Sequence, residues 1–241
     1  MKYLINYVRY SIIAVVLIVV VAIATTVSDV SVNTETNDYP VIIIDAGHGG
    51  VDGGAVADDG TVEKELNLDI ALKLNELLIS KGYKTILTRD GDYSIHDESA
   101  DTVRKKKVSD LHNRLEIVNS NKNAILVSVH QNYFTESKYS GTQVFYSPNA
   151  PESSVLADCI QKKVVSQLQP DNTRQIKQSD SSIFLLFNSQ IPSVMVECGF
   201  LSNQNETKKL KDEKYRQQMA EAVCDGIIKY LCSREESLSA A

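Results

Sequence analysis

The stretch Val41–Ala55, VIIIDAGHGGVDGGA, decides the fold of this 241-residue chain. A short apolar run that ends in Asp45 and is followed by glycines is typical of a buried strand in a parallel sheet. His48 follows that strand, at the edge where open α/β sheets place their binding sites. The glycines let the loop fold tightly and leave the His48 imidazole free. Glycine-rich loops after a strand also bind phosphate, so a phosphate site stays open as a second interpretation of this segment.

The rest of the chain alternates between helical and strand patterns, which predicts an α/β fold. About 200 residues follow Pro40, enough for one domain with its own core. The expected elements are a helix over 63–80, a strand over 83–88, a helix over 108–119, a strand over 124–129, a strand over 141–147, a helix over 151–168, a strand over 193–197 and one or two helices over 205–231.

Residues 1–28 are expected to be a signal peptide or a membrane anchor. Lys2 and Arg9 precede an uncharged run, Tyr10–Ser28, that would rise about 28 Å as a helix, close to the ~30 Å thickness of the hydrocarbon core of a bilayer. Ala22–Ala24 fits a signal-peptidase site, so cleavage and retention both stay open. The basic residues before the run predict that the remainder is exported, as a secreted or membrane-anchored protein. Further domain limits are a linker at 29–40, a folded domain at 41–233 and a frayed tail at 234–241.

Charge and cysteine content exclude some classes of protein. A net charge of −6 and an aromatic share of 7% argue against a nucleic-acid-binding surface. The cysteines lack the CxxC spacing of metal sites, so buried free thiols are expected, with one disulfide left open. The four are Cys159, Cys198, Cys224 and Cys232.

The charged segment 89–107 carries five acids and then the basic run Arg104–Lys107. Such a segment is typical of a solvated loop. The alternative is that it borders a substrate groove. His96 and His112 have no candidate metal partner nearby in the sequence, so both are expected to be surface residues.

Two histidines and one glutamate form a candidate metal site. His48 and His130 each follow an apolar strand, and Glu63 begins a helix whose apolar residues recur at helical spacing over 66–77. A glutamate in a first helical turn also complements the helix dipole. Glu63, however, lies on the apolar stripe, where a carboxylate needs a partner. Two histidines and one carboxylate, with an open fourth position, are the ligands of a catalytic zinc site. The sequence therefore predicts Zn²⁺ bound by His48, Glu63 and His130.

Glu197 ends the third strand of this kind, Ser193–Glu197, SVMVE. Burying an acid after an apolar strand costs free energy unless the acid is paired or functional. Its position corresponds to those of His48 and His130, so Glu197 is the candidate general base of the site.

The chain resembles the zinc-dependent N-acetylmuramoyl-L-alanine amidases, the amidase-3 family. The motifs GHGG, VEKELNL, SVHQN and VECGFLSN occur in this order between about 41 and 230. The resemblance implies that His48, Glu63 and His130 are the zinc ligands and Glu197 the catalytic acid/base. It also implies a twisted, mostly parallel sheet with helices on both faces, and hydrolysis of the bond between N-acetylmuramic acid and the L-alanine of the stem peptide in peptidoglycan. Ala46 departs from the proline of many relatives, a change expected to affect loop stiffness rather than chemistry.

Within the family the chain most resembles the spore-cortex, germination-specific amidases of endospore-forming bacteria. RKKKVSDLHNRLEIVN and NTRQIK support that placement. The resemblance implies a location in the forespore intermembrane space or cortex, and a functional partnership with a muramic acid deacetylase that completes muramic-δ-lactam for germination. An accessory activator protein stays open.

Three other functions stay in view at this point. A zinc peptidase that cuts within stem peptides would use the same metal ligands. A non-catalytic wall-binding module would need a broken metal set, whereas all four proposed residues are present. A nucleotide-binding protein is disfavoured because no helix is expected to start directly after GHGG.

Overall fold

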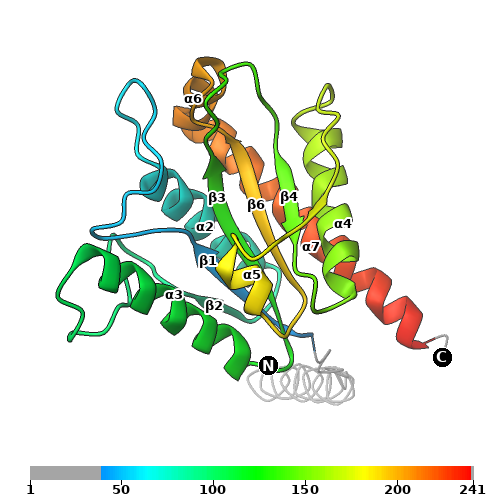
Figure 1. The fold of residues 1–241 in the computed structure, drawn as a ribbon. Coiled ribbons are helices and arrows are strands. Elements are labelled where there is room, and N and C mark those ends of the chain that lie inside the picture. The colour runs from blue at the N-terminus through cyan, green and yellow to red at the C-terminus, as the bar shows by residue number, and fades with distance from the viewer. Residues whose placement is uncertain (1–38, 240–241) are drawn as a thin grey trace, which may run out of the picture. The chain divides into compact units, whose positions relative to one another are not determined.

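The computed structural model describes residues 39–239 of the chain (Figure 1). The predicted signal peptide or membrane anchor, and all but the last two residues of the predicted linker, lie outside this part. Within the described residues, no helix is both long and apolar enough to cross a membrane. The domain that carries the candidate site is described over the whole of 41–233.

A six-stranded sheet forms the centre of the domain, in the order β2-β1-β3-β6-β4-β5. Its strands are β1 (Val41–Ala46), β2 (Thr85–Leu87), β3 (Ala124–Asn132), β4 (Gln143–Tyr146), β5 (Lys177–Gln178) and β6 (Ser193–Phe200). The β4–β6 pairing is antiparallel, and the other four pairings of the described sheet are parallel. The predicted α/β fold with a mostly parallel sheet is therefore confirmed.

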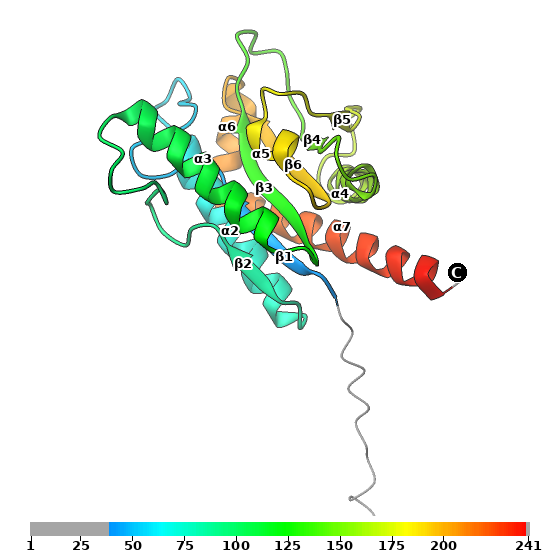
Figure 2. The same cartoon turned by 60° about the horizontal axis from the view of Figure 1, so that its bottom comes forward.

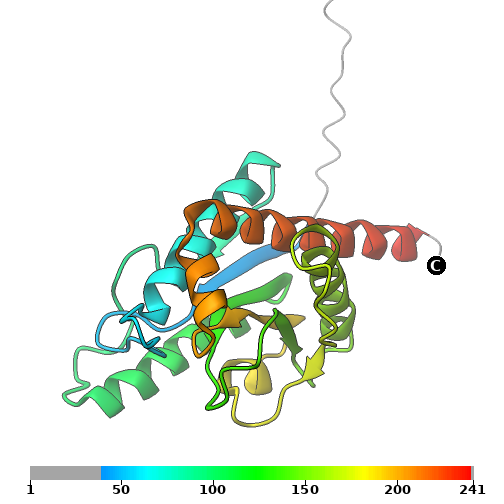
Figure 3. The same ribbon diagram turned by 90° about the horizontal axis from the view of Figure 1, so that it is seen from above.

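Helices cover both faces of the sheet. They are α2 (Glu63–Ser80), α3 (Val103–Ser120), α4 (Glu152–Gln167), α5 (Phe184–Asn188), α6 (Gln204–Lys211) and α7 (Glu213–Ser239). Figure 2 shows α3 and α5 on the near side of the sheet. In the view from above, α2, α4 and α7 lie on the opposite side from α3 and α5 (Figure 3).

Alternate residues of β1 pack on opposite faces of the sheet. Ile42 and Ile44 belong to the larger core, which includes residues of α2, α4 and α7, and Ile43 belongs to the smaller core with α3 and α5. All three are fully buried, which stabilises the fold by roughly 1.5–3 kcal/mol for each side chain. A strand that is covered on both faces needs apolar residues at every position. This is why the sequence reads as a continuous apolar run.

Several predicted boundaries differ from the structure. The strands predicted over 124–129 and 193–197 continue to Asn132 and Phe200, so His130 and Glu197 lie within β3 and β6. Helix α3 begins at Val103 instead of 108, because the Thr102 side chain accepts a hydrogen bond from the Lys105 backbone N–H (3.2 Å) and caps the helix. The basic run Arg104–Lys107 therefore forms the first turns of a helix and is not part of a loop. Helix α7 continues to Ser239, so the predicted frayed tail at 234–241 is helical over 234–239. No glycine or proline follows Gly226 to interrupt it.

Candidate metal centre and active site

The candidate site lies at the carboxyl edge of the sheet. The strands β1, β3 and β6 are adjacent and parallel. His48 follows β1 by two residues, and His130 and Glu197 are direct partners in the β3–β6 pairing. Glu63 is the first residue of α2, which packs against β1 and β3. The fold therefore brings the four predicted site residues to one place.

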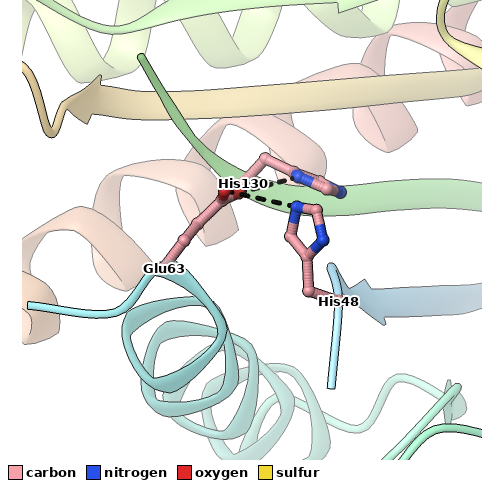
Figure 4. Close-up of side chains that lie close together, drawn as sticks. All are labelled: His48, Glu63 and His130. Carbon is pink, nitrogen blue, oxygen red and sulfur yellow. Dashed lines mark hydrogen bonds and ion pairs between the residues drawn. The ribbon is translucent and has the colours of Figure 1, made fainter. Parts of the chain in front are cut away.

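Glu63 is the centre of the cluster (Figure 4). Its Oε2 lies 3.2 Å from His48 Nε2, and its Oε1 lies 3.0 Å from His130 Nδ1. The two imidazole rings meet edge to face, with their centroids 4.9 Å apart. Each histidine thus directs one ring nitrogen at the same carboxylate.

Glu63 is held in place by several further hydrogen bonds. Its Oε2 accepts from the Ala55 backbone N–H (2.8 Å), and its Oε1 accepts from the Gln131 backbone N–H (3.1 Å) and the Asn67 side-chain amide (3.2 Å). Asn67 lies one turn after Glu63 on α2 and also donates to Gly47 O (3.2 Å). The carboxylate is therefore buried in a fixed orientation, at 3% exposure.

Two glycines make room for this arrangement. A Cβ at Gly54 would lie 2.5 Å from Glu63 Oε2, and a Cβ at Gly47 would lie 2.2 Å from His130 Nε2. Gly54 also has a φ of +69°, which disfavours other residues. The glycines of the loop thus serve close packing against the cluster.

The loop amides argue against the phosphate interpretation. The backbone N–H groups of Gly47, Gly49, Gly50 and Gly54 donate to Val129 O, Asp52 O, Asp92 Oδ1 and Asp52 Oδ1. A phosphate site needs such groups to be free for the ligand. In addition, α2 starts only at Glu63, well after the glycines.

The electrostatics of the cluster suit a cation. Burial raises the pKa of Glu63, but hydrogen bonds to His130 and His48 and their charges outweigh this effect and hold the pKa far below its usual range. Burial lowers the pKa of His48, while hydrogen bonds to Asp52 and Glu63 and their negative charges raise it to about 9. The buried Glu63 carboxylate thus carries negative charge between two imidazoles, where a cation would be stabilised.

The donor set fits a zinc ion. One donor atom each from His48, Glu63 and His130 lie within 4.8 Å of one another. His48 Nε2 and His130 Nδ1 lie 3.2 and 3.0 Å from different oxygens of the Glu63 carboxylate. Two imidazole nitrogens and one carboxylate are the protein ligands of known catalytic zinc sites.

Two fully buried arginines hold the loop that carries His48. Arg89 donates to the carbonyl oxygens of Ala46 (2.8 Å) and Gly47 (3.0 Å), and Arg114 donates to those of Ala46 (2.8 Å) and His48 (2.7 Å). His48 has a φ of 63°, which is unfavourable for a residue with a side chain. The arginine contacts stabilise this conformation of the loop.

Arg114 also neutralises two buried carboxylates, those of Asp45 and Asp110. Burial raises the pKa of Asp45, but Arg114, His130 and the Ser128 hydroxyl outweigh this effect and hold it at about 2. This network is not evident from the sequence. Its one signal is Asp45, a carboxylate at the end of an apolar strand, where it needs a buried cationic partner.

Glu197 lies beside His130 and next to the cluster. Burial raises the pKa of Glu197 to about 7, while the charge of His130 opposes the shift and that of Glu63 adds to it. Its Oε2 is buried and has no hydrogen-bond partner among the described residues. A buried carboxylate oxygen without a partner is costly unless it serves a ligand or a reaction.

A cavity of about 280 Å³ opens beside the cluster, between α3 and α5. Its lining includes His48, His130, Lys107, Ile183 and Phe184. Lys107 comes from the segment 89–107, so part of that segment borders the site. His48 and His130 thus both face this cavity.

The remaining residues of interest lie apart from the cluster. His96 hydrogen-bonds with Ser94, and His112 with the carbonyl oxygen of Val108. The four cysteines are free thiols, so the disulfide alternative is not realised. Cys198 and Cys224 are buried as expected, whereas Cys159 is half-buried and Cys232 is exposed.

Known proteins with similar sequences include N-acetylmuramoyl-L-alanine amidases. The chain matches the profile of the Amidase_3 family, N-acetylmuramoyl-L-alanine amidase, over residues 42–229. The germination-specific N-acetylmuramoyl-L-alanine amidase of Bacillus subtilis is 32% identical over 194 residues, which cover 80% of this chain and 81% of that protein. The amidase LytC of the same organism is 32% identical over 193 residues, 78% of this chain and 35% of that protein.

Solved structures give the same result. The CwlD amidase from Clostridioides difficile, in complex with the GerS lipoprotein, is similar with a TM-score of 0.77 and 45% identity over 80% of this chain and 99% of that chain. An N-acetylmuramoyl-L-alanine amidase from Clostridium difficile 630 is similar with a TM-score of 0.70 and 31% identity. The match covers 81% of this chain and 98% of that chain. The family match over residues 42–229 spans all four site residues. The chain therefore belongs to the Amidase_3 family and is an N-acetylmuramoyl-L-alanine amidase.

Proposed function

We propose that the chain cuts the bond between N-acetylmuramic acid and the L-alanine of the stem peptide with a zinc ion and a glutamate acid/base. His48, Glu63 and His130 hold the ion, and Glu197 transfers the proton. The observation that carries the proposal is the meeting of three metal-binding donors at one sheet edge, with Glu197 as the direct β6 partner of His130. When bound there, zinc supplies a Lewis acid that polarises a carbonyl group and lowers the pKa of a water molecule to ~7.

Glu197 is suited to move a proton in both directions. Its pKa of about 7 lets the carboxylate accept a proton from the attacking water and later release it to the amine of the leaving L-alanine. The unpartnered Oε2 leaves one oxygen available for an incoming polar group. Glu63 is already fixed by Asn67, Gln131 and Ala55, so the site needs little rearrangement on binding.

Two variants separate metal binding from proton transfer. His48→Ala is expected to lose zinc from the purified full-length protein, measured by elemental analysis. Glu197→Gln is expected to retain zinc and to lose roughly 10²–10⁴-fold in turnover of peptidoglycan. Stoichiometric zinc in His48→Ala would refute the ligand set, and near-normal turnover in Glu197→Gln would remove Glu197 from the mechanism.

We also infer a role in the spore cortex, outside the cytoplasm. The support is similarity to the germination-specific amidase of Bacillus subtilis and to CwlD of Clostridioides difficile. CwlD is in complex with the GerS lipoprotein, so an accessory protein is proposed for this chain as well. A muramic acid deacetylase would then act on the peptide-free product to complete muramic-δ-lactam. Loss of muramic-δ-lactam from the cortex of a deletion strain would support this role, and an unchanged cortex would exclude it.

A further inference from the structure

His48 has a second contact, on the side of its ring that faces away from Glu63. Its Nδ1 lies 2.9 Å from Asp52 Oδ2, while its Nε2 faces Glu63. A carboxylate that accepts a hydrogen bond from one ring N–H fixes the tautomer, so that the other nitrogen presents its lone pair. Asp52 therefore lies where it can direct Nε2 of His48 at the metal centre.

Asp52 is itself fixed from three sides. Its backbone forms a bridge with Gly49, with N–O distances of 2.9 and 3.0 Å. Its Oδ1 accepts a hydrogen bond from the Gly54 backbone N–H (3.2 Å) and pairs with Lys107 Nζ (2.6 Å). One carboxylate oxygen thus contacts His48, and the other is held by the loop and by α3.

Lys107 differs from its neighbours in the basic run. Lys105 pairs with the exposed Asp101 (2.9 Å), away from the cluster, whereas Lys107 lines the cavity beside His48. Arg114 of the same helix donates to the His48 carbonyl oxygen (2.7 Å). Helix α3 therefore supports His48 at two points: through Arg114 on the backbone, and through Lys107 and Asp52 on the ring.

We propose that Asp52 is the positioning residue for His48, and that Lys107 holds Asp52 in place, so that both set the affinity for the metal ion. The proposal rests on the proposed function in one respect, that His48 is a metal ligand. Asp52 acts through His48 and has no direct part in the chemistry. Lys107 of α3 thereby supports the metal centre through Asp52.

The test is the zinc dissociation constant of the full-length protein, measured by competition with a chromophoric chelator. Asp52→Ala is expected to weaken zinc binding about 10- to 100-fold. Asp52→Asn keeps an oxygen that can accept from Nδ1 but loses the charge, so it should restore part of the affinity. Lys107→Met should weaken binding less than Asp52→Ala, because the bond between Asp52 and His48 remains.

Two controls separate positioning from general damage. Asp58→Asn removes an exposed carboxylate of the same loop, and Lys105→Met removes an exposed cation of the same run. Both should bind zinc as the wild type does. The visible absorption of the Co²⁺-loaded protein should shift in Asp52→Asn and stay unchanged in the controls. Melting temperatures of the metal-free proteins report any loss of fold.

The outcomes are distinct. If wild-type protein binds zinc and Asp52→Ala and Asp52→Asn bind it within twofold of wild type, the role of Asp52 is refuted while the proposed function stands. The role of Asp52 is also refuted, and the proposed function also stands, if Asp58→Asn weakens zinc binding as much as Asp52→Ala does. If wild-type protein binds no zinc, the proposed metal centre fails, and the role of Asp52 fails with it.

Discussion

Replacing Arg114 by leucine should be among the most damaging single changes in the domain. The guanidinium is 1% exposed and pairs with Asp45 and Asp110, which are 2% and 6% exposed. Removing one partner of a buried ion pair costs about 3–5 kcal/mol, because the remaining charge is left without compensation. The variant also loses the hydrogen bonds to the carbonyl oxygens of Ala46 and His48. Against a typical total of about 5–15 kcal/mol, this loss brings the domain close to unfolding.

Urea denaturation followed by circular dichroism measures this loss. Arg104→Leu, at an exposed position of the same helix, is the matched control and should change the free energy of unfolding by about 0.5 kcal/mol or less. The double variant Asp45→Asn, Arg114→Leu should recover part of the loss, because one unpaired charge is removed. A loss below about 1 kcal/mol for Arg114→Leu would refute the view that this pair is buried and coupled.

Three further predictions follow from contacts and charges. Gly54→Ala should weaken zinc binding about 10-fold or more, because the added Cβ would lie 2.5 Å from Glu63 Oε2. An unchanged zinc affinity, measured by competition with a chelator, would contradict this packing. Gly226→Ala should lower the free energy of unfolding by about 1–3 kcal/mol, because the added Cβ would lie 2.5 Å from the Ile160 Cα. A rise in the melting temperature of this variant would show that α4 and α7 pack less closely. The Asp45 pKa of about 2 lies below its unfolded value of about 3.9. The ionised Asp45 carboxylate therefore stabilises the fold above pH ~4, and this stabilisation is lost as the pH falls toward 2. Acid denaturation of the wild type should show this loss, and Asp45→Asn should lack that part of the pH dependence.

The main elements of the fold could be predicted because their signals are local. The apolar run of β1 and the helical stripe that begins at Glu63 depend on residues within one turn or one strand, and both elements are found as expected. The candidate site followed from the same signals, because parallel strands place His48 and His130 at one edge. Comparison with known amidases confirmed the family that the motifs indicated.

The support of the site could not be predicted, because its contacts join distant segments. Arg114 and Asp45 are 69 residues apart, and an arginine in a helix of low hydropathy gives no sign that it is fully buried. Asp52 and Lys107 read as parts of a loop and of a charged run until the fold brings them together. The start of α3 is not evident from the sequence because a charged first turn resembles a loop, and the capping role of Thr102 becomes evident only in the structure.

Mass spectrometry of purified spore-cortex peptidoglycan, after incubation with the zinc-loaded protein and with Glu197→Gln as control, tests the assigned activity most directly. The wild type alone is expected to give peptide-free muramic acid and released stem peptides that begin with L-alanine. Fragments cut within the stem peptide would contradict the assigned bond and indicate a zinc peptidase. Equal cleavage by wild type and Glu197→Gln would contradict the assigned mechanism.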